Sequence, residues 1–368
     1  MKVAVIFGTR PEAIKMAPVV RALRAREDVE TRVWSTGQHR EMLAQVMDLF
    51  GIEADRDLAV MQPGQSLNGV FARVLTRLEE VFDEERPDRV LVHGDTTTAA
   101  AAATAAFHRR IPIGHVEAGL RSGRLDQPWP EEFNRRLVDV VADQLYAPTE
   151  GARRHLLSEN LGDKRIVVTG NTVVDALLHV NARMDAEPDL EAGLAARFPQ
   201  LDPSRRLVLV TGHRRENFGE GFLNICRALH DISDEPDVQV LYPVHLNPNV
   251  RQPVMGLLAD RPNISLVEPV DYLSFVHLMS RSAVILTDSG GVQEEAPSLG
   301  KPVLVMREVT ERPEAVEAGV VRLVGTDPAI ITRSVREALG APAVAEIKNP
   351  YGDGRAAERI VSEIVGAP

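Results

Sequence analysis

Cysteine, aromatic residues and long apolar runs are all scarce in this chain, and each shortage excludes a class of protein. The single cysteine, Cys226, forbids an intrachain disulfide and leaves too few thiols for a zinc cluster, which favours a cytoplasmic protein. No segment approaches the roughly 18 apolar residues of a membrane span, and the apolar start is shorter than a signal peptide requires. Basic residues are also outnumbered, 42 against 53 acidic ones, and the net charge of −11 disfavours nucleic acid and anionic membranes as partners.

The 368 residues are enough for two domains, since one domain takes roughly 100–200 residues. Short apolar runs typical of buried strands alternate with longer segments of helical periodicity, and the whole alternation occurs twice. In the first half the predicted strands are Val3–Phe7, Thr31–Ser35, Arg89–His93, Ile111–Val116, Gln144–Ala147 and Ile166–Thr169. In the second half they are Leu207–Thr211, Val238–Tyr242, Ile264–Val267, Ala283–Thr287, Pro302–Met306 and Val320–Val324.

This alternation indicates parallel sheets that are covered by helices on both faces. We predict an α/β protein of two doubly wound, Rossmann-like domains, residues 1–170 and 171–355, with a hinge near Gly170–Asn171. The C-terminal helical pattern, about residues 356–368, is a candidate to pack back on the first domain. In such sheets ligands bind beyond the carboxyl ends of the strands, so the polar residues that follow each strand are the candidates for a site.

Glycine and two cations follow the first predicted strand. Gly8 permits a close backbone approach, and Arg10 and Lys15 place positive charge near the start of a helix, which already favours anions. An ordinary turn with solvated charges explains the same residues equally well.

Carboxylates follow the third and fourth predicted strands. Asp95 comes two residues after His93, although Asp95 or Thr96 would also serve as a helix N-cap and His93 as a core histidine. Glu117 lies between an apolar strand and a glycine, where we expect burial to raise its pKa, as acid–base catalysis requires. The alternative for Glu117 is a buried salt bridge with Arg121.

Glu131 and Arg135 follow a loop rich in proline and tryptophan, Pro128–Pro130. They are four residues apart and share one face of the helix that starts there, either as site residues or as a solvated ion pair. The loop before them has the character of a positioned lid.

The second half of the chain offers an anion site. Ser289–Gly291 stands between a strand and a helix, where bare backbone N–H groups and a helix dipole suit a pyrophosphate. Glu295 lies about one turn into that helix, within reach of a ribose, and His213 and Arg312 add donors. The segment is not a Gly-x-Gly-x-x-Gly fingerprint, and the histidines lack metal-ligand spacing, so we predict neither a nicotinamide cofactor nor a metal.

In their order along the chain, these motifs resemble the bacterial family of non-hydrolysing UDP-N-acetylglucosamine 2-epimerases. The resemblance runs from Phe7 to about Arg359. The segments that carry it are Gly8–Lys15, Val92–Thr98, Gly114–Arg121, Pro130–Glu132 with Asn134–Arg135, Thr169–Thr172, Gly212–Asn217, Pro243–His245 and Thr287–Glu295. Several motifs at family spacing are far more specific than any one of them.

The resemblance implies a glycosyltransferase-B-type architecture with the active site in the cleft between the two domains. It also implies interconversion of UDP-N-acetylglucosamine and UDP-N-acetylmannosamine, in which UDP is eliminated to give 2-acetamidoglucal and then adds back, without a cofactor. By resemblance, the catalytic set is Asp95, Glu117, Glu131, His213 and Lys15. The set that binds the UDP-sugar is Arg10, Arg135, Tyr272, Phe275, Ser289, Gly290, Gly291, Glu295 and Arg312.

The resemblance further implies a homodimer and, in some family members, a second UDP-N-acetylglucosamine that acts as an activator. The matching activator positions are Gln38, Arg214 and His245, but Glu41 and Gly64 stand where some relatives have Gln and Arg, which leaves activation open. Three alternatives also stay open: a retaining glycosyltransferase, a nucleotide-sugar-binding protein without turnover, and an epimerase for a modified sugar.

Overall fold

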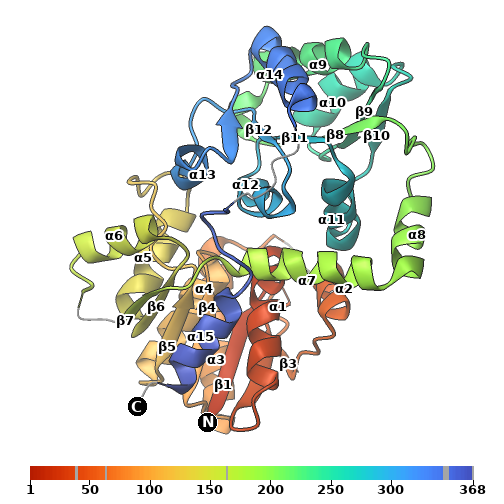
Figure 1. Ribbon diagram of the computed structural model, residues 1–368. Coiled ribbons are helices and arrows are strands. Elements are labelled where there is room, and N and C mark those ends of the chain that lie inside the picture. Colours follow the sequence, from red (N-terminus) through yellow and green to blue (C-terminus); the bar gives the residue numbers. More distant parts are fainter. Residues whose placement is uncertain (38–39, 63, 163–164, 343–347, 367–368) are drawn as a thin grey trace. The chain divides into compact units, whose positions relative to one another are not determined.

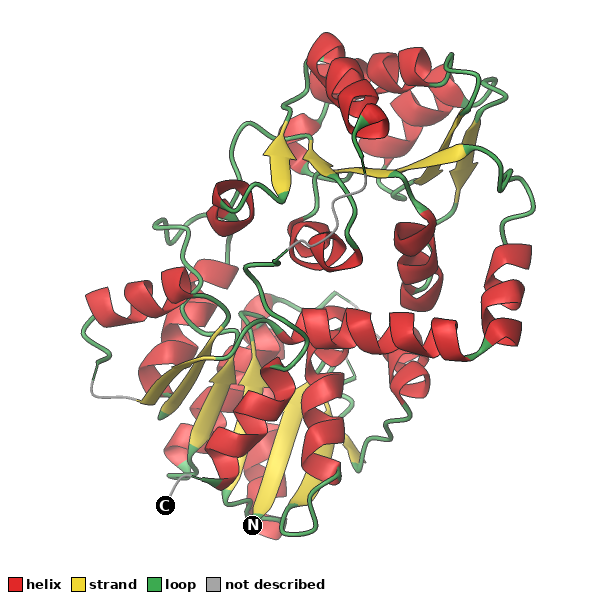
Figure 2. Cartoon of the chain, viewed as in Figure 1, coloured by secondary structure: helices red, strands yellow, loops and turns green. Residues whose placement is uncertain are grey.

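The computed structural model describes the chain except for residues 38–39, 63, 163–164, 343–347 and 367–368. The chain forms two compact units, Met1–Ala176 with Tyr351–Pro368, and Leu177–Pro350. The division falls inside helix α7 (Thr172–Ala186). Each unit contains one parallel sheet with helices packed around it (Figures 1 and 2), which confirms the predicted α/β class.

The sheet of the first unit has seven parallel strands in the order β3-β2-β1-β4-β5-β6-β7. The strands are β1 (Lys2–Phe7), β2 (Glu30–Ser35), β3 (Arg56–Asp57), β4 (Arg89–His93), β5 (Ile113–Val116), β6 (Gln144–Ala147) and β7 (Arg165–Val168). The helices, besides the start of α7, are α1 (Arg10–Arg24), α2 (Arg40–Phe50), α3 (Leu67–Glu84), α4 (Thr97–His108), α5 (Glu131–Val141), α6 (Glu150–Ser158) and α15 (Ala356–Val365).

The central strand β1 is buried on both faces, which its unbroken apolar sequence predicts. Ala4 and Ile6 join the cluster formed with α3, α4 and α5, whereas Val3 and Val5 point to the opposite face. The alanines of Ala99–Ala103 in α4 are at most 1% exposed, because small side chains let the helix approach the sheet and its neighbours closely. The C-terminal helix α15 packs beside α1 (Figure 1).

The sheet of the second unit has six parallel strands in the order β10-β9-β8-β11-β12-β13. The strands are β8 (Arg206–Thr211), β9 (Val238–Pro243), β10 (Ile264–Val267), β11 (Val284–Thr287), β12 (Val303–Val305) and β13 (Val321–Leu323). The helices are α8 (Pro188–Ala196), α9 (Glu220–Ile232), α10 (Pro248–Leu258), α11 (Tyr272–Arg281), α12 (Gly290–Glu295), α13 (Pro313–Glu317) and α14 (Pro328–Gly340), with 3₁₀ turns η1 (Arg215–Asn217) and η2 (Ala296–Leu299).

Both sheets reverse their strand order at one point, between β1 and β4 in the first unit and between β8 and β11 in the second. Doubly wound sheets bind ligands at such a switch point, beyond the carboxyl ends of the strands. The polar turns predicted from the sequence follow these same strands, so each unit gathers its candidate residues at one edge of its sheet. Across the described residues, no helix is long and apolar enough to cross a membrane.

Candidate functional site

The turn after β1 is occupied by a carboxylate of the chain itself. Oε2 of Glu12 accepts hydrogen bonds from the backbone N–H of Gly8 at 3.0 Å and of Thr9 at 2.8 Å, and Oε1 accepts one from Thr96 Oγ1 at 2.7 Å. Glu12 is 2% exposed. The expectation that this helix start favours an external anion therefore needs correction, because Glu12 already satisfies the amides. Arg10 is half-buried at the start of α1, beside that turn.

Glu117 forms a buried ion pair with Lys15, which lies on α1. Its Oε2 also accepts a hydrogen bond from Asn171 Nδ2 at 2.8 Å and lies 3.7 Å from His93 Nε2. Burial alone would raise the pKa of Glu117, but Lys15 and His93 outweigh it and hold the pKa well below its ordinary value. The prediction of a raised pKa is therefore wrong.

Arg121, the other partner considered for Glu117, binds different carboxylates. It lies 2.8 Å from Asp139 Oδ2 and 2.7 Å from Glu159 Oε2. Asp139 also binds the ring of His115 at 2.6 Å, and the other ring nitrogen of His115 lies 2.8 Å from the carbonyl oxygen of Gly94. This network holds the turn between β4 and α4 in place through the carbonyl oxygen of Gly94.

Asp95 pairs with Arg135 across the turn after β4. The Nε of Arg135 donates to Asp95 Oδ2 at 3.1 Å, and Asn134 Nδ2 donates to the backbone oxygen of Asp95 at 2.9 Å. Thr96 is the N-cap of α4 and accepts a hydrogen bond from Ala99 N at 3.0 Å, so Asp95 is free of that structural role.

Glu131 is the first residue of α5 and is half-buried. The ion pair considered for Glu131 and Arg135 does not form, because Arg135 binds Asp95 and lies 3.3 Å from Oε2 of Glu132 instead. Since β4 and β5 are adjacent and α5 contacts Asp95, the first unit gathers the three predicted carboxylates at one edge of its sheet.

In the second unit, Asp288 fills the turn after β8 as Glu12 fills the turn after β1. Its carboxylate accepts hydrogen bonds at 2.9 Å from the backbone N–H of both His213 and Arg214, and it is fully buried. The ring of His213 stacks on that of His245, with the ring centres 5.7 Å apart. Burial lowers the pKa of His213, and Arg214 and His245 lower it further against the opposing pull of Asp288. The lowered pKa favours the neutral form of the His213 ring.

The turn after β11 is a candidate position for an anion. Its N-cap residue, Ser289, makes no side-chain hydrogen bond to the amides of α12 within the described part of the chain. A methyl group built on Gly290 would lie 3.6 Å from Nη2 of Arg214 and 3.7 Å from Nη2 of Arg312. We call Ser289, Gly290, Gly291, Arg214 and Arg312 the anion cradle. Arg214 thus lies at the predicted pyrophosphate position, although the sequence placed it in the activator set.

Glu295 lies one turn into α12, beside the anion cradle. The hydroxyl of Tyr272 donates a hydrogen bond to its Oε1 at 2.7 Å. A methyl group on Gly291 would lie 3.9 Å from its Oε2, so this oxygen faces the start of the helix. Phe275 is half-buried one turn beyond Tyr272 on α11. Burial, followed by the charge of Glu295, raises the pKa of Tyr272 well above its ordinary value, so its hydroxyl stays protonated and acts as a donor.

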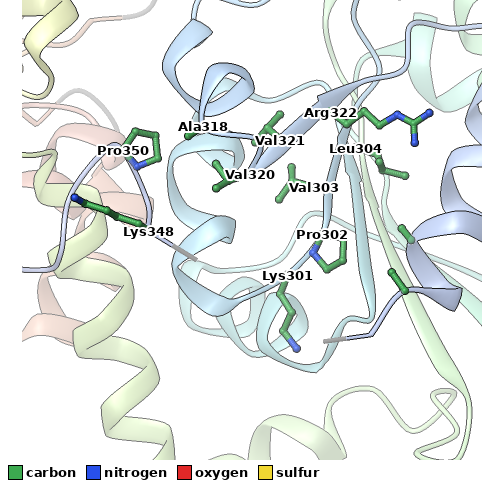
Figure 3. A pocket seen from close by; sticks show the side chains of 13 residues that line it. Lys301, Pro302, Val303, Leu304, Ala318, Val320, Val321, Arg322, Lys348 and Pro350 are labelled. Atoms are coloured by element: carbon green, nitrogen blue, oxygen red, sulfur yellow. The ribbon is translucent and has the colours of Figure 1, made fainter. Parts of the chain in front are cut away.

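An apolar cavity of about 590 Å³ lies elsewhere in the second unit, against β12 and β13 (Figure 3). Its walls include Val303, Leu304, Val320 and Val321. None of the residues predicted for the site lines it, although Lys301, Arg322 and Lys348 are among its lining residues (Figure 3).

The sequence did not identify His93 and Asn171, which lie near Glu117, as site residues. His93 was considered for the core, and Asn171 was part of a family-like motif without a role. The signal for both was their position near the end of a predicted strand: His93 is the last residue of Arg89–His93, and Asn171 is two residues beyond Ile166–Thr169. Gln38, predicted for the activator set, lies outside the described residues.

The fold and the two polar sheet edges define a doubly wound α/β protein of the glycosyltransferase-B type. A glycosyltransferase of kitacinnamycin has the same fold, with a TM-score of 0.61 at 15% identity over 98% of both chains.

The model of the UDP-N-acetylglucosamine 2-epimerase family matches residues 21–365. The UDP-N-acetylglucosamine 2-epimerase of Escherichia coli K12 is 55% identical over 99% of this chain and 98% of its own length. A crystal structure of UDP-GlcNAc 2-epimerase from Neisseria meningitidis bound to UDP-GlcNAc superposes with a TM-score of 0.91 at 48% identity and covers both chains completely. The chain belongs to the UDP-N-acetylglucosamine 2-epimerase family.

Proposed function

We propose that this protein is an isomerase that interconverts UDP-N-acetylglucosamine and UDP-N-acetylmannosamine by inversion at carbon 2 of the sugar. Its full-length relatives carry the name of this activity, and one of them is described with UDP-GlcNAc bound. The observation that carries the proposal is the presence of two kinds of group, one in each unit. The first unit holds the buried carboxylate Glu117 beside Lys15, and the second holds the anion cradle next to Glu295.

The chemistry explains why both kinds of group are needed. The hydrogen on carbon 2 is not next to a ketone, so its direct removal as a proton would be very slow. If a base takes this proton while the C1–O bond breaks, the bonding electrons form a C1=C2 double bond and UDP leaves. The product, 2-acetamidoglucal, regains UDP at carbon 1 while a proton returns to the opposite face of carbon 2.

The carboxylates of the first unit are proposed to exchange that proton. Because Lys15 keeps Glu117 ionised, Glu117 suits the role of proton acceptor rather than donor in the resting protein. Asp95 is held by Arg135, and Glu131 opens the helix that supplies Arg135. We propose that these two carboxylates complete the proton transfer around the sugar.

The anion cradle is proposed to stabilise UDP as it leaves and to hold it for return. Two guanidinium groups, from Arg214 and Arg312, converge near Gly290, where the amides of α12 begin. Preorganised donors of this kind stabilise developing negative charge because they need no reorganisation during the reaction. Neutral His213 supplies a further N–H, and Glu295 is proposed to accept hydrogen bonds from the ribose hydroxyls.

The test is incubation with UDP-N-acetylglucosamine in heavy water, followed by proton NMR. We expect deuterium at carbon 2, with accumulation of UDP-N-acetylmannosamine and traces of UDP. Unlabelled substrate that is consumed only after addition of an acceptor would instead assign the protein to the glycosyltransferases. Binding of UDP without either reaction would leave a binding protein.

We further propose a cytoplasmic homodimer. The neighbouring helices α4 and α5 expose Phe107, Phe133 and Val140, which are 55%, 54% and 59% exposed. Phe133 and Val140 are seven residues apart and share one side of α5, as a covered helix face requires. Light scattering after size-exclusion chromatography should give twice the chain mass of 40.4 kDa. A value of one chain mass at micromolar concentration would contradict the dimer.

Activation by a second UDP-N-acetylglucosamine is proposed on the positions of Arg214 and His245 at the strand ends of the second unit. It predicts a lag when UDP-N-acetylmannosamine is the only substrate, which traces of UDP-N-acetylglucosamine abolish. A reaction that starts at full rate would exclude activation.

A further inference from the structure

We infer that His93 is a positioning residue for Glu117: together with Lys15 and Asn171 it holds carboxylate oxygen Oε2, and it thereby leaves Oε1 for the sugar. The inference rests on the proposed epimerase function and deepens it. His93 is not proposed to touch the substrate.

The first observation is that the imidazole of His93 is buried although no hydrogen bond within the described part of the chain accounts for its position. His93 is 4% exposed, and both of its ring nitrogens are buried without a hydrogen-bond partner among the described residues. Buried polar groups normally have a partner, because an unbonded one costs free energy. Nε2 of His93 lies 3.7 Å from Oε2 of Glu117, so a small rotation of either side chain brings the two into hydrogen-bond contact.

The second observation is that three elements meet on one oxygen atom. Lys15 comes from α1, His93 from the end of β4, and Asn171 from the residue before α7, and their contacts with Glu117 all involve Oε2. The amide of Asn171 cannot turn round freely, because its Oδ1 accepts a hydrogen bond from the N–H of Val173 at 3.1 Å. Its Nδ2 therefore faces Glu117 as a donor.

The third observation concerns the turn that carries His93. Gly94 has a φ of +63°, its N–H donates to the backbone oxygen of Val116 at 2.9 Å, and its own oxygen lies 2.8 Å from a ring nitrogen of His115. A methyl group on Gly94 would lie 3.8 Å from Oε1 of Glu117. Oε1 therefore lies over the same turn that presents Asp95.

It follows from these three observations that Lys15, His93 and Asn171 fix the orientation of the Glu117 carboxylate. A carboxylate that rotates freely spends little time in the orientation that proton transfer needs, and fixing one oxygen removes that freedom before the substrate arrives. Glu117 itself has a φ of +69°, an uncommon conformation for a residue with a side chain, so the surrounding structure must hold it in place.

The experiment compares His93→Leu, which fills similar space without a donor, with His93→Gln, which supplies an amide N–H. We expect His93→Leu to lower kcat at least tenfold while KM changes less than about threefold, because the substrate still binds but Glu117 loses its orientation. His93→Gln should recover part of kcat. The matched control is His277→Leu in the second unit, another buried histidine with an unbonded Nδ1, which should keep kcat.

A second readout separates positioning from general damage. The titratable groups that face Glu117 are Lys15 on α1 and His93 on β4. Removing His93 removes one influence that keeps Glu117 ionised, so the acid limb of the kcat profile should move to higher pH in His93→Leu. The titration midpoint of the Glu117 carboxyl, followed by carbon-13 NMR and assigned by its loss in Glu117→Gln, should rise as well.

The NMR titration does not need turnover. A wild-type protein that fails to epimerise would therefore overturn the proposed function, whereas the titration still decides whether His93 faces Glu117 as inferred. An unchanged midpoint in His93→Leu, with or without a fall in kcat, would overturn the positioning role.

Discussion

At the scale of single residues, the ionisation of Glu117 is decided by its neighbours rather than by burial. Burial raises a carboxyl pKa, and a facing cation lowers it. A pair of unit charges about 4 Å apart attracts by roughly 4 kcal/mol at an effective dielectric of about 20, which is equivalent to about three pKa units. That magnitude explains why Lys15 outweighs the burial of Glu117.

Glu117→Gln tests this carboxylate directly. We expect the variant to lose exchange at carbon 2 by roughly 100-fold or more, the usual contribution of a positioned acid–base group. Binding of UDP should persist, because the anion cradle lies in the other unit. The matched control is Glu150→Gln at an exposed site of the same unit, which should exchange like the wild type. Exchange at the wild-type rate in Glu117→Gln would remove Glu117 from the catalytic set.

The sequence identified Glu117 but not its partner, for a physical reason. Arg121 was the cation within four residues along the chain, whereas Lys15 is 102 residues away and reaches Glu117 only through the folded sheet. Asp95 was likewise identified without its geometry, because the choice between Asp95 and Thr96 as N-cap depends on backbone dihedral angles. Residue types at strand ends are therefore predictable, but their long-range pairing is not.

At the scale of elements, three turns that follow strands differ in whether a carboxylate of the chain binds their backbone N–H groups. Glu12 fills the turn after β1 and Asp288 the turn after β8, whereas in the turn after β11 the side chain of Ser289 makes no hydrogen bond to the amides of α12 within the described part of the chain. The sequence predicted the open turn, since Ser289–Gly291 is rich in glycine. It did not predict the filled ones, because the blocking carboxylates act through side-chain rotamers.

Gly290→Ala tests the open turn. The added methyl group meets no atom closer than 3.6 Å, so the fold should tolerate it, but it occupies the space between the two guanidinium groups. We expect UDP affinity, measured by calorimetry, to fall at least about tenfold. Gly256→Ala in α10 is the matched control: nothing lies within 4 Å of the new methyl group, and it should bind UDP normally. Normal affinity in Gly290→Ala would place the pyrophosphate elsewhere.

The attachment of α15 gives a second test at this scale. Asp175 on α7 accepts hydrogen bonds from the N–H groups of Ala356 and Ala357, and burial raises its pKa to about 6. The folded state then binds this proton more tightly than the unfolded state, so the contribution of Asp175 to stability is greatest at low pH and is lost as the pH rises through about 6.

Asp175→Asn removes this titration. Relative to the variant, the wild type should gain free energy of unfolding as the pH falls from about 7 to about 4, by up to roughly 3 kcal/mol for a shift of about two pKa units. Urea unfolding of both proteins at several pH values measures the difference. Parallel pH dependences for the two proteins would contradict the raised pKa.

Most elements were predictable because apolar periodicity determines them. Strands β4, β6 and β10 have the predicted bounds, and most others differ by one or two residues at an end. The strand β3 has two residues, too few for any periodicity, and it was not predicted. Helix α12 ends at Glu295 and the 3₁₀ turn η2 follows it, since Pro297 lacks the N–H that would continue the α-helix.

At the scale of the whole molecule, a net charge of −11 coexists with a local concentration of cations. Charges separated by more than about 10 Å are largely screened at 0.1 M salt, so most of the acidic surface acts weakly on a ligand in the anion cradle. Arg214 and Arg312 both lie close to Gly290, although Arg312 also forms an ion pair with Glu294.

The contrast between the negative net charge of the chain and the cations of the anion cradle predicts the effect of salt on UDP binding. If the local cations dominate, raising the salt from about 0.05 to about 0.5 M should weaken UDP affinity, because screening reduces their attraction. Calorimetry at constant pH and temperature measures the trend, with sodium chloride as the only variable. Affinity that improves with salt would mean that the net negative charge of the molecule controls binding.

The carboxylates in the two filled turns have a consequence for the redesign of this fold. The strand order of the second sheet is the one that dehydrogenases use, and they bind a dinucleotide pyrophosphate at the first strand-to-helix turn. Here that position already holds a covalently tethered anion, Asp288, with Glu12 in the same place in the first unit. A designer who wanted a redox enzyme on this scaffold would have to remove an acidic side chain before adding any glycine fingerprint.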